Sequence, residues 1–270
     1  YIFQYLVDGQ IRIGDPYADK TSDPFNDQEI IDQNRHPGLK PFPAGKTEFQ
    51  ATYLQTAQDA YTWKNLSYEK PQPEELVIYE LLVRDFDDRR TYNAVIERLD
   101  YLKDLGINAL QLMPIMEFEG NLSWGYNPSF FFAPDKYYGT KNDLKRLIDE
   151  AHGKGMVVIL DMVLNHAFGQ NPMVRLYNDG DYGAPTVDNP WFNRVAKHPF
   201  NVGYDFNHES PYTKTFVDSV NNYWLTEYKF DGFRFDLSKG FTQVDTGNDV
   251  NLWSQYDPSR VRIWKNIYDQ

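Results

Sequence analysis

The chain has 270 residues, a formal net charge of −12 at neutral pH and no cysteine. The lack of cysteine excludes a disulfide framework, a cysteine-ligated metal site and a thiol nucleophile. The acidic balance argues against nucleic acid or an anionic membrane surface as a partner, because both favour basic patches. No apolar stretch approaches the roughly 20 residues that a transmembrane helix needs.

Residues 1–68 consist of short apolar runs broken by Asp-Gly, Asp-Pro and proline-rich stretches, without a helical period. We interpret this part of the chain as β-rich. The stretch 69–75, with two prolines and three acidic residues, is expected to be a linker between domains. The chain begins with Tyr1 instead of methionine, which suggests a truncated N-terminus and leaves the localisation open.

From residue 76 onward, strand-like and helix-like patterns alternate, which is typical of a parallel sheet covered by helices. In the first helical pattern, Val95, Leu99, Leu102 and Leu105 share one face. The sequence therefore predicts an α/β fold. The predicted strands are residues 76–83, 107–112, 156–162 and 230–235, and the predicted helices are residues 91–105, 142–154, 212–228 and 259–268.

The stretch 167–210 is rich in Asn, Asp, Gly and Pro and has little periodicity. It follows the third predicted strand and precedes the third predicted helix. Structureless loops of this length are uncommon inside compact domains. We therefore expect either a long loop or a small inserted subdomain.

The fourth predicted strand ends in Arg234 and Asp236, which strand alternation places on one face, opposite the neighbouring phenylalanines. A lone carboxylate on a buried sheet face would be costly, so the guanidinium is expected to keep Asp236 ionised and oriented. Such a carboxylate can act as a nucleophile. The third predicted strand also ends in a polar cluster, which runs from Asp161 to His166.

The runs 161–166 and 232–239 resemble two sequence signatures of the alpha-amylase family, which comprises retaining glycoside hydrolases and transglycosylases built on a (β/α)8 barrel. The resemblance implies that Asp236 is the catalytic nucleophile and that Arg234 is its ion-pair partner. It also implies that Asp161 braces Arg234 within the substrate-binding group and that His166 binds a sugar hydroxyl. The alternative, polar residues that merely end two strands, is less favoured because both runs occur in family order.

A third set of runs, 112–118, 123–128 and 133–140, resembles the isoamylase, pullulanase and branching-enzyme branch of that family. Tyr126 is our candidate for an aromatic sugar platform, because an aromatic ring stacks on the C–H face of a pyranose. Trp124 is a second substrate-binding candidate, although we favour local packing for it. Glu117 and Glu119 are expected to be ordinary loop carboxylates.

The same resemblance implies that residues 1–68 are the end of an immunoglobulin-like β-sandwich and that residues 76–270 are the first half of a (β/α)8 TIM barrel. The stretch 167–210 would then be the family's insertion. A closed barrel needs eight strands, and the family's general acid follows the fifth. We therefore expect a fragment that is inactive by itself and whose partner is the remaining half of the barrel.

Two further positions bear on substrate and metal. Lys239 is a candidate for substrate contact, with a surface position as the simpler interpretation, and Gly240 follows it where many amylases have a histidine. Asn165 occupies a position that in many alpha-amylases contributes to a structural calcium site, and nearby acidic loop residues are compatible with a hard cation. No other cofactor is expected.

The predicted substrate is an α-glucan polysaccharide or oligosaccharide of the starch or glycogen type, and the aromatic content of 16% is in keeping with sugar stacking. We favour hydrolysis through a covalent intermediate on Asp236. Two alternatives stay open: a glucan branching transferase, and an inert glucan-binding relative without the acid. A nucleotide-binding protein is discarded, because neither the dinucleotide nor the P-loop pattern occurs.

Overall fold

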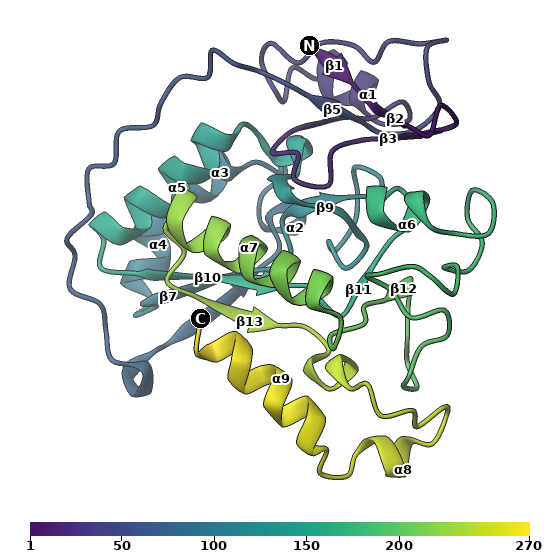
Figure 1. The fold of residues 1–270 in the computed structure, drawn as a ribbon. Coiled ribbons are helices and arrows are strands. Elements are labelled where there is room, and N and C mark those ends of the chain that lie inside the picture. The colour runs from purple at the N-terminus through teal and green to yellow at the C-terminus, as the bar shows by residue number, and fades with distance from the viewer.

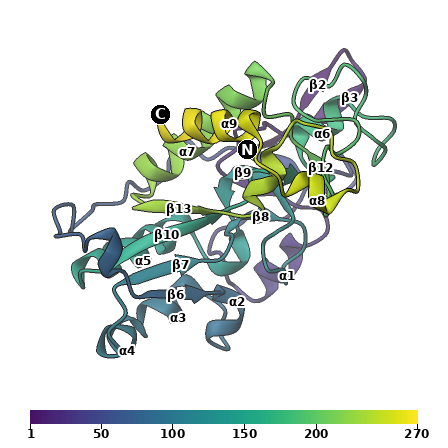
Figure 2. The same ribbon diagram turned by 90° about the horizontal axis from the view of Figure 1, so that it is seen from below.

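The computed structural model describes residues 1–270. Its centre is a four-stranded parallel sheet in the order β13-β10-β7-β6, and Figure 2 shows these four strands side by side in this order. Strands that follow one another in the chain are neighbours in the sheet, as in the first half of a (β/α)8 barrel. The strands are β6 (Ile78–Leu81), β7 (Ala109–Leu112), β10 (Val157–Met162) and β13 (Gly232–Phe235).

Helices alternate with these strands along the chain, which confirms the predicted α/β class (Figure 1). The helix α5 begins at a capping box in which Thr140 accepts from the Asp143 backbone and Asp143 accepts from the Thr140 backbone. The helices of the barrel part are α2 (Val83–Phe86), α3 (Tyr92–Ile96), α4 (Leu99–Asp104), α5 (Lys141–Gly153), α7 (Pro211–Glu227), α8 (Val250–Trp253) and α9 (Pro258–Tyr268).

The prediction of one helix over residues 91–105 is wrong in detail. The structure contains two short helices, α3 and α4, separated at Glu97 and Arg98. Val95, Leu99 and Leu102 are fully buried as predicted, but Leu105 is exposed. The reason is that α4 ends before Leu105, where the chain turns away through Gly106 in the left-handed region.

Residues 1–53 form two small antiparallel sheets above the barrel part (Figure 1). The turn of the β2–β3 hairpin places Asp8 and Gly9 in the left-handed region, which suits these residue types. This confirms β structure in the segment, whereas its assignment to the end of a sandwich stays a prediction. The elements are β1 (Ile2–Phe3), β5 (Ala51–Tyr53) and β4 (Thr21–Ser22) in one sheet, β2 (Tyr5–Val7) and β3 (Ile11–Ile13) in the other, and helix α1 (Asp27–Asp32).

A buried ionic cluster joins this N-terminal part to the hairpin β8 (Met116–Phe118) and β9 (Pro128–Pro134). The Lys136 ammonium donates to Thr21 Oγ1 at 2.6 Å, lies 3.3 Å from Asp27 Oδ1 and pairs with Glu117. Glu117 is therefore not the ordinary loop carboxylate that we predicted. Burial raises the pKa of Glu117, and the attraction of Lys136 opposes that rise.

Replacing Lys136 with Met is expected to destabilise the protein by about 3–5 kcal/mol, because two buried carboxylates lose their cation. Urea unfolding followed by tryptophan fluorescence measures this loss. The matched control is Lys64→Met, since Lys64 forms only an exposed pair with Glu150 and should change stability by about 1 kcal/mol at most. Equal stability of the two variants would show that the cluster does not hold the two parts together.

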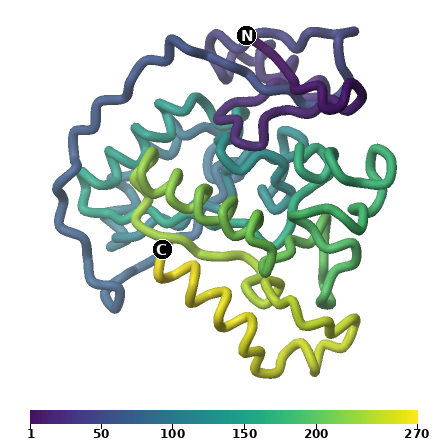
Figure 3. Tube along the Cα trace, viewed as in Figure 1, coloured from purple at the N-terminus to yellow at the C-terminus, as the bar shows by residue number.

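The segment between β5 and β6 runs down the outside of the molecule, where Figure 3 traces it along one edge. The carboxylate of Asp149 on α5 accepts hydrogen bonds from the Tyr61 hydroxyl and from the backbone N–H groups of Lys64 and Asn65. Farther along, Lys70 pairs with Asp231 at 2.8 Å. The predicted linker 69–75 is thus fixed to the barrel part, and it includes the short 3-10 helix η1 (Pro73–Glu75).

The stability that Asp231 contributes through this attachment depends on pH. Burial would raise its pKa, but hydrogen bonds with His152, Lys70 and the backbone N–H of Val158 outweigh burial and lower it to about 2. A carboxyl group with a depressed folded-state pKa stabilises the fold above its unfolded pKa of 3.8 and loses that contribution as the pH falls toward 2. The contribution at neutral pH is of the order of 2 kcal/mol.

The variant Asp231→Asn is accordingly expected to be less stable than the unmodified protein at pH 7, with the difference shrinking between pH 4 and pH 2. Thermal unfolding at a series of pH values measures this convergence. Asp88→Asn serves as the control, because Asp88 is exposed and forms no ion pair. A stability difference that stays constant over this pH range would contradict the assignment to Asp231.

The predicted insertion 167–210 has little regular secondary structure but is not structureless. It contains the helix α6 (Pro172–Leu176) and the strand β12 (Tyr204–Asp205), which pairs with β11 (His166–Ala167) directly after β10. This pairing brings the end of the insertion back to the end of the third barrel strand.

Every helix in the chain is too short or too polar to cross a bilayer.

Candidate active site

The ends of β10 and β13 bring three charged side chains together. The register pairs Asp161 with Arg234 across the two strands. The guanidinium nitrogen Nη1 of Arg234 donates to Asp161 Oδ1 and Oδ2 at 2.9 and 3.0 Å and to Asp236 Oδ1 at 2.9 Å. One nitrogen thus links the two carboxylates, and the three residues meet at the strand ends as the pattern predicts.

Asp161 is the buried member of this group, with no exposed surface. Its second oxygen also accepts a hydrogen bond from the Tyr126 hydroxyl at 2.8 Å. Burial raises the pKa of Asp161, whereas the hydrogen bonds from Arg234 and Tyr126 favour its ionised form. Because these two residues occupy its oxygens, Asp161 orients Arg234 and Tyr126 and has no free oxygen for a ligand.

Asp236 is the accessible member. Its backbone N–H donates to the carbonyl of Met162 at 3.0 Å, which fixes the residue beyond the end of β13. Its Oδ1 accepts from Arg234, and no protein group donates to its Oδ2. The following residue, Leu237, is in the left-handed region with φ of 42°, an unfavourable conformation for a side chain of this size and one that is common at functional sites. The geometry leaves one carboxylate oxygen of Asp236 free to react.

Tyr126 reaches this group from the loop between β8 and β9. The preceding residue, Gly125, has φ of 91°, and a Cβ atom there would lie 2.2 Å from the Pro114 carbonyl oxygen. Only glycine permits this close approach, which directs the Tyr126 ring toward Asp161. Burial and the Asp161 carboxylate raise the pKa of the Tyr126 hydroxyl, so it stays a hydrogen-bond donor.

His166, which begins β11, and the preceding residue Asn165 support the site. His166 Nε2 lies 2.8 Å from the Tyr126 carbonyl oxygen, and Nδ1 contacts Asn165 Oδ1. Asn165 Nδ2 donates to the Asp236 carbonyl at 3.1 Å. Burial lowers the pKa of His166, and the hydrogen bond to the Tyr126 carbonyl opposes this shift. Both ring nitrogens are engaged within the protein, and a sugar-hydroxyl contact by His166 stays a prediction that requires one of these bonds to open.

Two other candidates are exposed and make no hydrogen bond with the Arg234 group. Trp124 is 60% exposed, so the local packing that we favoured for it is wrong: the inward turn at Gly125 leaves the indole on the surface. Lys239 is exposed and directed toward α8, where its Nζ lies 3.4 Å from Ser254 Oγ and 5.3 Å from the centre of the Trp253 ring. The structure does not bring Lys239 to the Arg234 group.

The structure explains why residue 240 is a glycine, which the sequence alone did not reveal. A Cβ atom on Gly240 would lie 3.1 Å from Nε2 of His198. His198 comes from the insertion, is buried, and stacks on Trp253 while its Nε2 lies 3.3 Å from Asp205 Oδ1. A histidine side chain at position 240 would meet this ring, so the insertion occupies the space beside residue 240.

The predicted calcium position is occupied by protein contacts. The amide of Asn165 is engaged on both sides, by His166 and by the Asp236 carbonyl. The acidic loop residues Asp179 and Asp181 pair with arginines instead of converging on Asn165. No group of three or more His, Asp or Glu side chains is arranged to hold a metal ion. A structural calcium ion at Asn165 stays a prediction, since calcium also binds amide and backbone carbonyl oxygens.

Comparison of the sequence with known proteins identifies the relatives of this chain. Residues 84–203 match the alpha amylase catalytic domain. The chain is 32% identical over 230 residues to malto-oligosyltrehalose trehalohydrolase of Saccharolobus solfataricus, a match that covers 84% of this chain and 36% of that protein. It is 40% identical over 182 residues to a 1,4-alpha-glucan-branching enzyme of Rhizophagus irregularis, covering 65% of this chain and 26% of the enzyme.

A solved structure extends the similarity to the fold. The crystal structure of pullulanase type I from Bacillus subtilis in complex with maltose has a TM-score of 0.57 and 28% sequence identity, and the match covers 71% of this chain and 31% of the pullulanase. The chain spans 36% or less of the length of each of these three proteins. The strand order, the carboxylate–arginine group and these matches agree, and the chain belongs to the alpha-amylase family.

Proposed function

We propose that the protein cleaves α-glucosidic bonds of starch-like or glycogen-like glucans with retention of configuration and that Asp236 is the nucleophile. The observation that carries this proposal is the arrangement of Asp236, which Arg234 holds through Oδ1 while Oδ2 stays free. The matches to a glucan branching enzyme and to a pullulanase bound to maltose support a glucan as the substrate.

In the proposed reaction, Asp236 Oδ2 attacks the anomeric carbon, and the glycosidic C–O bond breaks as the leaving oxygen takes a proton from a carboxylic acid. Water then attacks the glycosyl ester and gives its proton to the same carboxyl group, which releases the sugar and regenerates Asp236. Arg234 keeps the carboxylate of Asp236 ionised and oriented, and Asp161 in turn fixes the guanidinium of Arg234.

The general acid is not among the carboxylates near this site. Both oxygens of Asp161 are occupied, Glu117 is held by Lys136, and Glu119 accepts from the Gln170 backbone and the Ser129 hydroxyl. Retention requires a second carboxyl group about 5–5.5 Å from the nucleophile. We propose that a further barrel strand supplies it, and we expect residues 1–270 in isolation to show no hydrolysis.

The aromatic platform is the part of the site that would bind the sugar face. Tyr126 packs partly against the core and anchors its hydroxyl on Asp161, which leaves the ring in a fixed orientation beside Asp236. The exposed Trp124 lies two residues earlier in the same loop. We propose Tyr126 as the subsite next to the scissile bond and Trp124 as a more distant contact.

A second candidate, glucan branching, is favoured by the 40% identity to a branching enzyme. Both reactions share the covalent intermediate and differ in whether water or a glucan hydroxyl accepts the sugar. Incubating the full-length protein with soluble starch, glycogen and pullulan distinguishes them: hydrolysis releases reducing ends steadily, whereas branching lowers iodine staining of amylose with little release. If neither signal appears while glucan binding is retained, the chain is an inert glucan-binding relative and the proposal fails.

A further inference from the structure

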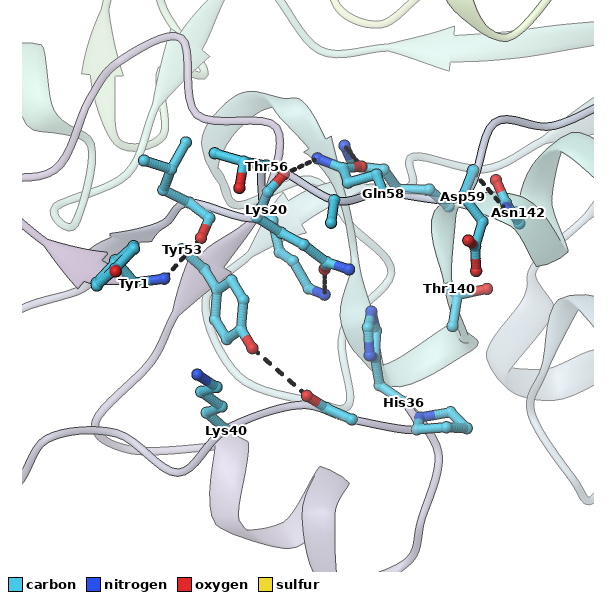
Figure 4. Close-up of a pocket in the computed structure, with 16 residues that line it drawn as sticks. Tyr1, Lys20, His36, Lys40, Tyr53, Thr56, Gln58, Asp59, Thr140 and Asn142 are labelled. Carbon is cyan, nitrogen blue, oxygen red and sulfur yellow. Dashed lines mark hydrogen bonds between the residues drawn. The ribbon is translucent and has the colours of Figure 1, made fainter.

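A polar cavity of about 570 Å³ lies away from the candidate active site, between the N-terminal part and the beginning of α5. Figure 4 shows its lining, which comes from the strand β5 and the residues after it, the loop that follows α1, and residues 140–142, together with Tyr1 and Lys20. None of the residues around Asp236 contributes to it. Its volume is within the range of small-molecule sites, which are roughly 300–1,000 Å³.

Lys20 is the first unusual feature of this cavity. It is only 8% exposed, yet no carboxylate lies within ion-pair distance of its ammonium group. The ammonium donates to Gln55 Oε1 at 3.2 Å and lies 4.6 Å from the centre of the Tyr53 ring. Lysine is rarely buried without a charged partner, because removing the cation from water is costly. The positive charge at the cavity wall therefore has no ion-pair partner in the protein.

His36 is the second feature. The residue is 7% exposed, and its Nδ1 atom is enclosed and has no hydrogen-bond partner in the protein. In Figure 4 the ring rises into the cavity between the end of Lys20 and Thr140. Buried polar atoms in folded proteins nearly always have hydrogen-bond partners. An unpartnered imidazole beside an unpaired ammonium points to a ligand that carries acceptor oxygens.

The beginning of α5 is the third feature. Residues 140–142 line the cavity, and the backbone N–H groups of Lys141 and Asn142 have no acceptor in the protein. The first turn of a helix of this length carries a partial positive charge and favours anions. The ammonium of Lys141, paired with Asp19, also lines the cavity. Three independent donors thus face one space: Lys20, His36 and the helix terminus.

The charge balance of the cavity is positive within an acidic protein. Burial and the nearby Lys141 and Lys136 lower the pKa of Lys20 to about 8, although Asp19 and Asp27 oppose this shift, so an anion in the cavity would stabilise the charged form. Lys141 and Lys40 add two further cations to the lining, and Asp59, which is exposed, is its single carboxylate. The remaining polar lining consists of amides and hydroxyls, including Gln55, Gln58 and Asn142.

We propose that this cavity binds a phosphate monoester, and specifically the monophosphate of a hexose. The phosphate would lie at the Lys20 ammonium, the His36 ring and the first turn of α5, where three kinds of donor converge. The amide side chains and the Tyr53 ring would contact the sugar, since the cavity is larger than a phosphate group requires. This site is separate from Asp236 and does not depend on the proposed hydrolysis.

Isothermal titration calorimetry and thermal unfolding with glucose 6-phosphate, inorganic phosphate and glucose test the proposal on the purified protein. Glucose 6-phosphate is expected to bind and to raise the unfolding temperature, and glucose is expected to do neither. If inorganic phosphate binds as tightly as glucose 6-phosphate, the sugar contacts are refuted and the site recognises phosphate alone. Binding of glucose as tight as that of glucose 6-phosphate, or no binding of any phosphate, would overturn the proposal.

The variant Lys20→Met distinguishes a ligand site from a purely structural lysine. Removing an unpaired buried charge is expected to leave the ligand-free protein as stable as before or more stable, while affinity for glucose 6-phosphate falls at least tenfold. Lys265→Met is the matched control, because Lys265 is exposed on α9 and lies outside the cavity; its affinity should be unchanged. Unchanged affinity in Lys20→Met, or an equal loss in Lys265→Met, would overturn the assignment. If Lys20→Met does not fold, His36→Gln supplies the same comparison.

Discussion

Replacing Asp236 with Asn is expected to lower the turnover of soluble starch by at least about a thousandfold, while the affinity for maltooligosaccharides changes by no more than a few-fold. The amide has the shape of the carboxylate and can still accept a hydrogen bond from Arg234. It lacks the negative charge that forms the glycosyl ester and stabilises the oxocarbenium-like transition state. Turnover and affinity therefore separate in this variant, and initial rates together with calorimetric binding measure both.

The matched control for this experiment is Asp245→Asn. Asp245 lies on the surface in the segment that follows β13 and pairs only with Lys197, at 3.4 Å. Its replacement should leave turnover and affinity within twofold of the unmodified protein. If Asp236→Asn retains more than about a tenth of the activity, Asp236 is not the nucleophile and the proposed mechanism is wrong.

Removing the guanidinium is the second change with a large expected effect. In Arg234→Met, Asp161 stays buried without its cation and Asp236 loses its only side-chain donor. We expect turnover to fall by about a hundredfold or more. The acidic limb of the pH–rate profile should also move to higher pH, because loss of a nearby cation raises the pKa of a carboxyl group. If Arg234 only supported the structure, its loss would lower the rate at every pH without moving the acidic limb of the pH–rate profile.

Arg234→Lys refines this test. In the structure all three contacts of the guanidinium with the two carboxylates come from the single nitrogen Nη1. A lysine ammonium carries the same charge, so Arg234→Lys should recover part of the activity that Arg234→Met loses. The control Arg262→Met removes an arginine whose only ion pair, with Glu209, is exposed. An unshifted pH profile in Arg234→Met would contradict the electrostatic role.

The parts of the site that could be predicted from the sequence are those that depend on local geometry. Strand alternation places Arg234 and Asp236 on one face whatever surrounds them, and parallel pairing of successive strands brings Asp161 beside them. For the same reason, the strands and the long helices of the barrel part agree with the patterns that predicted them. Periodicity is a local property of the chain, and burial of one face enforces it.

The parts that could not be predicted depend on contacts between distant segments. Thr21 and Glu117 are 96 residues apart in the chain and meet in the cluster around Lys136. Nothing near Glu117 in the sequence indicates that an N-terminal segment will bury it. The exposed position of Trp124 depends in the same way on the close approach of Gly125 to Pro114, which only the folded backbone reveals. Lys20 and His36 likewise have no local signature.

The most direct test of the central claim is mass spectrometry of the full-length protein after reaction with a fluorinated α-maltosyl fluoride. The good leaving group lets the first step proceed, and the added ring fluorine slows both steps, so that the glycosyl ester accumulates. The mechanism predicts one added disaccharide on the peptide that contains Asp236, and no label in Asp236→Asn. A label on a different carboxylate, or turnover of the reagent without any covalent adduct, would contradict the assignment of Asp236 as the nucleophile.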